Sequence, residues 1–385
     1  MVEKSVKEGN KASVIIYRAL YFLECCILFL AWFLKRYPFP QQVFLFMSSL
    51  SIMGGFAIYL WNFRRTGFSL EKILAGIFAL AFMILLPPSG YLDTAIDDLS
   101  MIVFFLLSVS VDKDDDNLIT ALFYFKLVVA MMVLLAYNGH LIHDVSGIRS
   151  HTEIVRHSYG FMHPNSLGMF FITLIYDFSL LRKPYRFVGG IIMLLAALLV
   201  FSVTDSRTSF FIALGIILCY FLKPILSKIK VSGYVIMPFV IGMFALGLAL
   251  PRYFTPDNPI FVTLNHLFTG RTGIGHAYLE QFGLNWMPRN IPTFTEINGV
   301  PMYDDSFYVD ALLRQGIILF CMYPTFLLVL LKGKKFTLFH TLLFLLTFFI
   351  GTMEHYGASV EICTILLLNY FAKFQVQISQ SVKTL

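Results

Sequence analysis

The sequence predicts an all-α, polytopic membrane protein with about twelve transmembrane helices, at roughly 20 residues per crossing, and a large outer loop between helices nine and ten. Two observations support this prediction. Hydrophobic residues make up 58% of the 385 residues, charged residues make up only 14%, and the mean hydropathy is +0.75. A soluble chain of this length could not bury so much apolar surface. In addition, basic clusters close every second gap between the apolar stretches. The bilayer is therefore the expected solvent.

The apolar stretches form a single transmembrane domain over residues 1–385, and their ends are placed to within several residues. Their even number puts both termini on the same side of the membrane. The predicted spans are 14–34, 43–61, 69–87, 98–111, 118–136, 166–181, 187–203, 209–226, 234–250, 308–331, 336–350 and 360–374.

The basic gaps predict the orientation, because short cytoplasmic loops carry an excess of Lys and Arg. We therefore expect these gaps and both termini in the cytoplasm, and the remaining gaps outside. The gap from Asp112 to Asp116 is acidic, but acidic residues contribute little to this rule. The basic residues are Arg64, Arg65, Arg182, Lys183, Arg186, Lys223, Lys228, Lys230, Lys332, Lys334 and Lys335.

Two outer loops, residues 137–165 and 251–306, are long enough to suggest function, since most connections span only a few residues. The second contains Tyr278, Phe282 and Trp286 among several Gly and Pro residues. These aromatic side chains suit a folded surface that stacks on sugar rings, although Tyr and Trp are also ordinary anchors at the membrane interface.

Composition also limits the partners. The net charge of +6 lies mostly in the cytoplasmic gaps, so it reports orientation and attraction to anionic lipid rather than nucleic-acid binding. All five cysteines fall within spans, and we expect neither disulfides nor a Cys-built metal site.

The first polar cluster runs from Arg156 to Gly168, where an outer loop leads into the sixth span. Asn165 is a suitable N-cap after Pro164, and a helix N-terminus favours a phosphate group. Capping explains Pro164 and Asn165, but it does not explain His163 or Arg156.

Two further clusters contain an arginine in an outer turn. In Thr204–Thr208, Asp205 and Arg207 either form a local pair or face a ligand, because an arginine at membrane depth usually faces a cavity or partner. In Thr269–Gly273, the glycines allow close approach of a ligand to the backbone and Arg271 can bind phosphate oxygens through two hydrogen bonds. A glycine-rich turn with a solvated arginine is the alternative.

The fourth cluster, Asp304–Tyr308, ends the long outer loop and precedes Arg314. Asp304 and Asp305 are candidate carboxylates for proton transfer, or an N-cap and its neighbour. Glu354 and His355, before the last span, are weaker candidates.

The string Gly160-Phe-Met-His-Pro-Asn-Ser-Leu-Gly168 resembles the G-F-x-H-P-N-x-L-G motif of Wzy-type polysaccharide polymerases, relatives of the O-antigen ligases. Ser206-Arg207 and Thr269-Gly270-Arg271 resemble two further elements of that family. The chain departs from the family pattern at Asp305, where Asn is common, and at Phe307, where Tyr is common. The related ligases carry a His in this neighbourhood, and this chain does not.

The resemblance implies a bacterial cytoplasmic-membrane enzyme that joins polyprenyl-diphosphate-linked oligosaccharide repeat units on the outer face, working beside a flippase and a chain-length regulator. Polyprenyl diphosphate is the leaving group, and fixed cations would stabilise its developing charge. The expected general base is Asp304, or else His163. No cofactor is expected, because arginines can replace a divalent metal. The expected diphosphate ligands are Arg156, Arg207, Arg271 and Arg314, with Asn165, Asp205, Asp305, Glu354 and His355 as further site residues.

Three alternative functions remain: a ligase of finished polymer, a flippase or transporter of lipid-linked sugars, and a scaffold without catalytic activity. A metal site is a further possibility, since five histidines crowd the first outer loop with Asp144 and Glu153, but the loop has neither an H-E-x-x-H pattern nor a Cys ligand. Charged residues within or near the spans are either functional or paired between helices. The five histidines are His140, His143, His151, His157 and His163, and these charged residues are Glu24, Lys126, Asp177 and Glu361.

Overall fold

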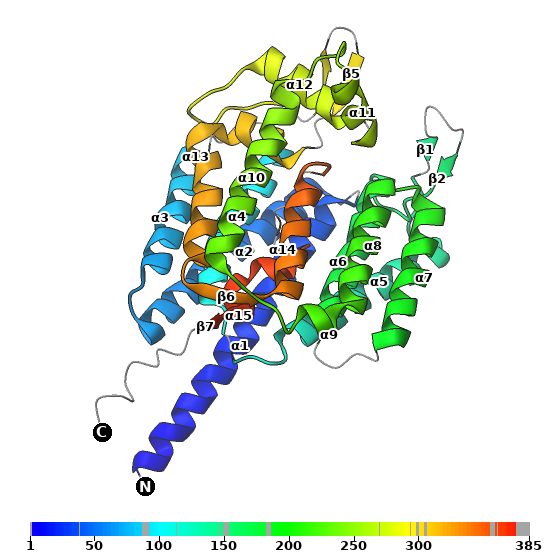
Figure 1. Ribbon diagram of the computed structural model, residues 1–385. Helices are drawn as coiled ribbons and strands as arrows, with labels where there is room; N and C mark the ends of the chain where they lie inside the picture. Colours follow the sequence, from blue (N-terminus) through cyan, green and yellow to red (C-terminus); the bar gives the residue numbers. More distant parts are fainter. Residues whose placement is uncertain are drawn as a thin grey trace.

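The structure is a computed structural model, and most of the chain is helical (Figure 1). The helices are α1 (Val2–Lys35), α2 (Gln41–Thr66), α3 (Leu70–Leu85), α4 (Leu92–Ser110), α5 (Leu118–Asn138), α6 (Pro164–Leu180), α7 (Arg186–Thr204), α8 (Arg207–Phe221), α9 (Lys223–Leu226), α10 (Gly233–Arg252), α11 (Pro259–Leu267), α12 (Arg271–Phe282), α13 (Phe307–Leu331), α14 (Leu338–Gly351) and α15 (Leu368–Phe371). The structure describes residues 2–37, 39–86, 92–112, 114–145, 147–148, 154–181, 186–268, 270–292, 294–297, 300–303, 306–354, 359 and 361–374.

Short strands complete the described chain. They form two antiparallel pairs, β1–β2 and β4–β5, and one three-stranded sheet in the order β3–β6–β7. The strands are β1 (Gly147–Ile148), β2 (Val155–Arg156), β3 (Lys230–Ser232), β4 (Phe294–Ile297), β5 (Val300–Tyr303), β6 (Lys334–Thr337) and β7 (Lys373–Phe374).

Six of the described helices are long and apolar enough to cross a membrane, which makes this a membrane protein. Their outward faces carry large apolar side chains, including Ile15, Met53, Leu135 and Leu199, each more than 60% exposed. A soluble protein rarely exposes so much apolar surface, and lipid tails are its natural neighbour here. The six candidate spans are Lys11–Lys35, Gln41–Thr66, Leu118–Asn138, Phe187–Thr204, Gly233–Arg252 and Phe307–Leu331.

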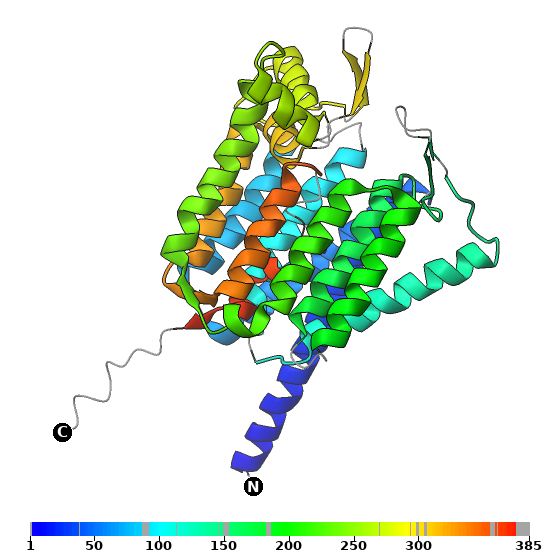
Figure 2. The same ribbon diagram turned by 45° about the vertical axis from the view of Figure 1, so that its right-hand side comes forward.

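The helical bundle has two ends that differ in structure (Figure 1). We call one the lobe end: it carries α11, α12 and the β4–β5 hairpin. We call the other the basic end: it carries the start of α1, α9 and the β3–β6–β7 sheet. In Figure 2, α6, α7 and α8 stand side by side. The helices α11 and α12 and the β4–β5 hairpin, which together we call the lobe, lie at one end of α10 and α13.

The long loop predicted over 251–306 is therefore folded. It contains α11, α12 and the β4–β5 hairpin, in which Phe294 pairs with Tyr303 and Ile297 with Val300. In the loop predicted over 137–165, β1 pairs with β2, with Gly147 opposite Arg156.

The prediction of a helical span over 360–374 is wrong. Between Glu361 and Phe374 the chain forms a 3₁₀ turn (Thr364–Leu366), the short α15 and β7. The side chains of this segment are buried through Leu368, and Asn369 donates a hydrogen bond to the Ser108 carbonyl oxygen at 3.0 Å. Irregular backbone of this kind is tolerated at membrane depth where protein, rather than lipid, surrounds it.

Of the charged residues predicted inside the spans, Lys126 and Asp177 form a pair between helices. Nζ of Lys126 on α5 lies 2.8 Å from Oδ2 of Asp177 on α6, and both side chains are almost fully buried. Thr364 donates a hydrogen bond to the same carboxylate. The pair therefore fixes α5 and α6 against the irregular segment.

Candidate functional site

The start of α6 is capped by His163, and not by Asn165 as the sequence suggested. His163 has extended backbone (φ −149°, ψ 141°), and its Nδ1 accepts a hydrogen bond from the Asn165 amide nitrogen at 3.1 Å. Pro164 explains the difference: it disfavours helical geometry in the preceding residue and suits the first helical position itself. The Asn165 side chain is consequently left available for other contacts.

Asn165 connects two charged residues that lie far apart in the sequence. Its Oδ1 accepts a hydrogen bond from Nη2 of Arg156 at 2.6 Å, and its Nδ2 donates to Oε1 of Glu354 at 3.4 Å. An amide can do both, because it offers an acceptor and a donor. The first outer loop is thereby joined to the chain that follows α14.

The same Glu354 oxygen forms an ion pair with Arg271 across 2.8 Å. Both side chains are buried, at 8% and 2% exposure. Arg271 is the first residue of α12, and Gly270 before it has φ +88°, which favours glycine. Gly270 thus turns the chain into α12, and Arg271 at the start of that helix meets Glu354.

Arg156 also reaches the turn between α7 and α8. Its Nε donates to the Thr204 carbonyl oxygen at 2.6 Å, while the His157 amide donates to the Val203 carbonyl oxygen at 2.9 Å. The first and second sequence clusters are therefore neighbours in space.

Gly168 keeps α6 close to α8. A Cβ at position 168 would lie 2.6 Å from Oγ of Ser209 and 3.1 Å from Cβ of Ser206. Ser206 in turn donates a hydrogen bond to Ser209 at 2.9 Å. The final glycine of the G-F-x-H-P-N-x-L-G string is thus required by packing.

Arg36 is a further cation at this place, and the sequence analysis missed it. It follows α1, is buried, and accepts a hydrogen bond at its carbonyl oxygen from the Met162 amide at 2.8 Å. Its position in the sequence held a signal: Lys35 and Arg36 lie in the first gap predicted outside, where basic residues are not expected.

His163 is neutral in this surrounding. Enclosure by protein, followed by the positive charges of Arg156, Arg271 and Arg36, lowers the pKa of His163 to about 4. The residue is nevertheless exposed to solvent. Because Nδ1 accepts the capping hydrogen bond, the neutral ring carries its proton on Nε2.

We call these residues the lobe-end cluster: Arg36, Arg156, His163, Asn165, Arg271 and Glu354. Within the described parts of the chain, the cluster contains three guanidinium groups and one carboxylate. Tyr159 (φ 48°) and Asp205 (φ 44°) border it, and backbone of this kind in non-glycine residues is concentrated at functional sites. The arrangement suits an anionic ligand, with Arg156 and Arg271 held in place by Asn165 and Glu354.

Of the other predicted residues, Arg207 follows the turn that Arg156 contacts, Arg314 is paired on α13, and three lie outside the described residues. Arg207 begins α8 with an exposed side chain. Arg314 on α13 pairs with Asp310, one helical turn earlier, at 2.8 Å. Asp304, Asp305 and His355 lie outside the described residues.

His157 pairs with Asp144, with 2.5 Å between Nδ1 and Oδ2. Burial acts to raise the pKa of Asp144, but hydrogen bonds from His157, Ser158 and Tyr159 outweigh it and hold the pKa below its usual value. Among the described residues, which do not include His151 or Glu153, no three His, Cys, Asp or Glu side chains form a group that could hold a metal ion.

Comparison of the chain with protein-family models, with curated proteins and with solved structures finds no match.

Proposed function

We propose that this protein is a membrane glycosyltransferase that polymerises polyprenyl-diphosphate-linked oligosaccharide repeat units at the lobe end of the bundle. One observation carries the proposal. Three segments distant in sequence bring Arg156 and Asn165, Arg271, and Glu354 into a continuous chain of polar contacts, beside His163. Two of these segments contain motifs that resemble the Wzy-type polymerases, and Arg156 also contacts Thr204, next to the third motif. The meeting of these motifs at one end of the bundle supports that resemblance.

In the proposed reaction, a sugar hydroxyl oxygen bonds to the anomeric carbon of the growing chain. The bond from that carbon to the diphosphate oxygen breaks, and polyprenyl diphosphate leaves with the electron pair. Arg156 and Arg271 stabilise the negative charge that develops on the leaving group, and Arg36 adds to the local positive potential. Cations held in place before the reaction are effective because they need not reorganise during it.

The hydroxyl proton passes to a general base. Asp304 is our first candidate and His163 the second. His163 is neutral at physiological pH, so it can accept a proton, but a pKa of about 4 makes it a weak base. With its proton on Nε2, His163 is better suited to donate a hydrogen bond to a sugar or phosphate oxygen.

A transporter of lipid-linked sugars is a second candidate. The buried Lys126–Asp177 pair beside the irregular segment that contains Thr364 favours it, because transporters place charges and broken helices within the membrane. The pair has an adequate structural role in joining α5 and α6. The lobe-end cluster, in contrast, has charge well beyond what helix capping requires, so the enzyme is the better supported function.

The test is to delete the gene in its own host and analyse lipid-linked glycans by mass spectrometry, scoring their length and the membrane leaflet that holds them. A polymerase predicts single repeat units on the outer leaflet and no polymer. Long lipid-linked polymer that is never transferred would instead identify a ligase, and single units retained on the inner leaflet a flippase. Complementation with the wild-type gene must restore polymer.

A further inference from the structure

One face of α2, near its end at the basic end of the bundle, lines an open groove of ≈ 610 Å³. Its lining residues are Ala57, Leu60, Trp61, Arg64 and Arg65. Their spacing of three, four, seven and eight residues from Ala57 places them on one face of the helix. Along that face, apolar side chains give way to an aromatic ring and then to two arginines.

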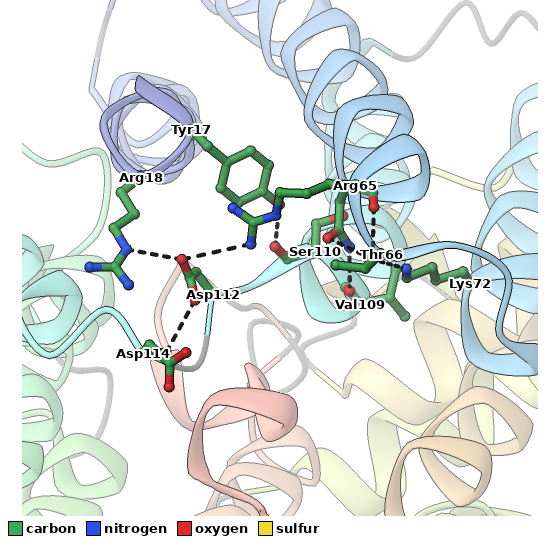
Figure 3. Close-up of polar contacts among 10 residues, drawn as sticks. Tyr17, Arg18, Arg65, Thr66, Lys72, Val109, Ser110, Asp112 and Asp114 are labelled. Atoms are coloured by element: carbon green, nitrogen blue, oxygen red, sulfur yellow. Dashed lines mark hydrogen bonds and ion pairs between the residues drawn. The ribbon is translucent and has the colours of Figure 1, made fainter. Parts of the chain in front are cut away.

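Arg65 is held in a fixed position by two neighbours (Figure 3). Its guanidinium carbon lies 4.5 Å from the centre of the Tyr17 ring, and its Nη2 lies 3.7 Å from Oδ2 of Asp112. Asp112 also binds Arg18 on α1 at 2.9 Å. The guanidinium therefore stays in place while 28% of the side chain remains exposed.

Trp61 belongs to the same assembly. Its ring meets Tyr17 edge to face, with 5.9 Å between the ring centres. Both the tryptophan and Arg65 thus pack on one tyrosine of α1, so α1 supports this wall of the groove.

Arg64 is exposed and, within the described parts of the chain, forms no ion pair. Basic residues at the end of a helix offset its dipole, which explains the charge of Arg64 and Arg65. It does not explain why they border an open groove whose other half is apolar. Leu60, one turn earlier, is 57% exposed and lies on the lipid-facing surface.

We propose that this groove is a binding site for an acidic phospholipid of the membrane leaflet at the basic end. The lipid phosphate lies between Arg64 and Arg65, the glycerol region lies against Trp61, and an acyl chain follows Leu60 and Ala57 toward the membrane interior. Basic pockets between helices near the membrane surface bind anionic headgroups in this way. The order of apolar, aromatic and basic residues along α2 matches the order of parts in a phospholipid.

A free phosphate or a protein segment fits this face less well. A free phosphate needs no exposed Leu60, and a docking protein would have to displace lipid from an apolar surface that is already solvated by it. The site is separate from the lobe-end cluster, so the proposal does not depend on the proposed glycosyltransferase activity.

Tryptophan quenching by brominated lipid tests the proposal on the full-length protein in nanodiscs. The nanodiscs are made of phosphatidylcholine with a fixed minority of phosphatidylglycerol, and one or the other lipid carries bromine on its acyl chains. The chain has three tryptophans, so the Trp61 contribution is the difference between wild type and Trp61→Phe, which keeps an aromatic ring beside Tyr17. We expect brominated phosphatidylglycerol to quench Trp61 about fivefold more, per mole, than brominated phosphatidylcholine.

The stronger quenching of Trp61 by brominated phosphatidylglycerol should vanish in R64Q/R65Q. In that variant the Trp61 contribution is again obtained by difference, from the triple variant that also carries Trp61→Phe. The preference for phosphatidylglycerol should persist in K228Q/K230Q, which removes the same charge from exposed positions at the same end of the molecule. R64Q alone breaks no described ion pair and should weaken the preference for phosphatidylglycerol. This single variant replaces the double variant in the test if the double variant does not fold. Folding is checked by size-exclusion chromatography.

Equal quenching by the two lipids would overturn the proposal, and so would a preference that survives R64Q/R65Q. If K228Q/K230Q lost the preference for phosphatidylglycerol as fully as R64Q/R65Q, the cause would be a diffuse positive surface potential, and the proposed site would be excluded. Reversal by inorganic phosphate would identify free phosphate as the occupant, and absence of quenching by either lipid would mean that protein covers the groove.

Discussion

Arg271 and Glu354 form a buried ion pair between the first residue of α12 and the segment that follows α14, with 2.8 Å between Nη2 and Oε1. The pair binds the lobe to the bundle and also lies within the proposed diphosphate site. Its two roles can be separated, because a stability measurement reports the first and polymer formation the second.

Breaking this pair on one side leaves a buried charge without its partner. We expect Arg271→Met and Glu354→Leu each to lower the free energy of unfolding by about 3–5 kcal/mol, and the double variant by less than the sum. Thermal unfolding in detergent measures this. Strict additivity would mean that the two side chains do not interact.

Arg271→Lys isolates the catalytic role, because it keeps the positive charge beside Glu354 but loses the planar group that binds two phosphate oxygens. We expect normal amounts of protein in the membrane and at least a tenfold loss of polymer, about 1.4 kcal/mol of transition-state stabilisation. Wild-type polymer levels in this variant would exclude Arg271 from the diphosphate site.

Asn165→Asp tests the amide between Arg156 and Glu354. The new carboxylate still accepts from Arg156, but it cannot donate to Glu354 and it places a second negative charge beside that residue. We expect polymer to fall by tenfold or more. The matched control is Asn258→Asp, an exposed cap on α11 that keeps its acceptor role, and it should leave polymer unchanged. Equal effects of the two substitutions would contradict this role for Asn165.

The lowered pKa of His163 has a consequence for stability. Between about pH 4 and 6.5 the unfolded chain binds more protons at this residue than the folded chain, so stability should rise with pH across that window. His163→Asn keeps a capping side chain and removes the titration, and its melting temperature should depend less on pH there. His266→Asn, exposed on α11, is the control. An unchanged pH dependence in His163→Asn would show that this ring titrates normally.

Arg207 is the most accessible of the predicted arginines. We expect Arg207→Ala to abolish polymer without lowering the amount of protein in the membrane, since the exposed side chain contributes little to stability. Arg252→Ala, exposed in the last turn of α10, should leave polymer intact. Normal polymer in Arg207→Ala would remove this residue from the proposed site.

Asp304→Asn tests the first candidate for the general base. The substitution keeps the size of the side chain and removes its ability to take a proton, so we expect turnover to stop while lipid-linked substrate still binds. Binding and turnover are measured on the same purified protein. Undiminished turnover would leave His163 as the remaining candidate.

The sequence by itself determined that this is a helical membrane protein, because apolar runs of sufficient length need no tertiary information to be recognised. It also identified Arg156, His163, Asn165, Arg271 and Glu354 as candidates, since each lies in a polar stretch between apolar ones. The excess of basic residues in alternate gaps predicted an orientation, which stays a prediction.

Only the tertiary structure decided which candidates meet. Contacts such as Arg156–Asn165–Glu354–Arg271 join positions up to 189 residues apart, and no periodicity encodes them. The structure also replaced Asn165 by His163 as the cap of α6, because Pro164 moved the helix start by two residues. It replaced a predicted last helix by buried irregular chain, because protein groups such as the Ser108 carbonyl oxygen pair with polar groups that lipid would leave unpaired. Local pattern thus determines which segments enter the membrane, and packing between distant segments decides which polar groups are brought together.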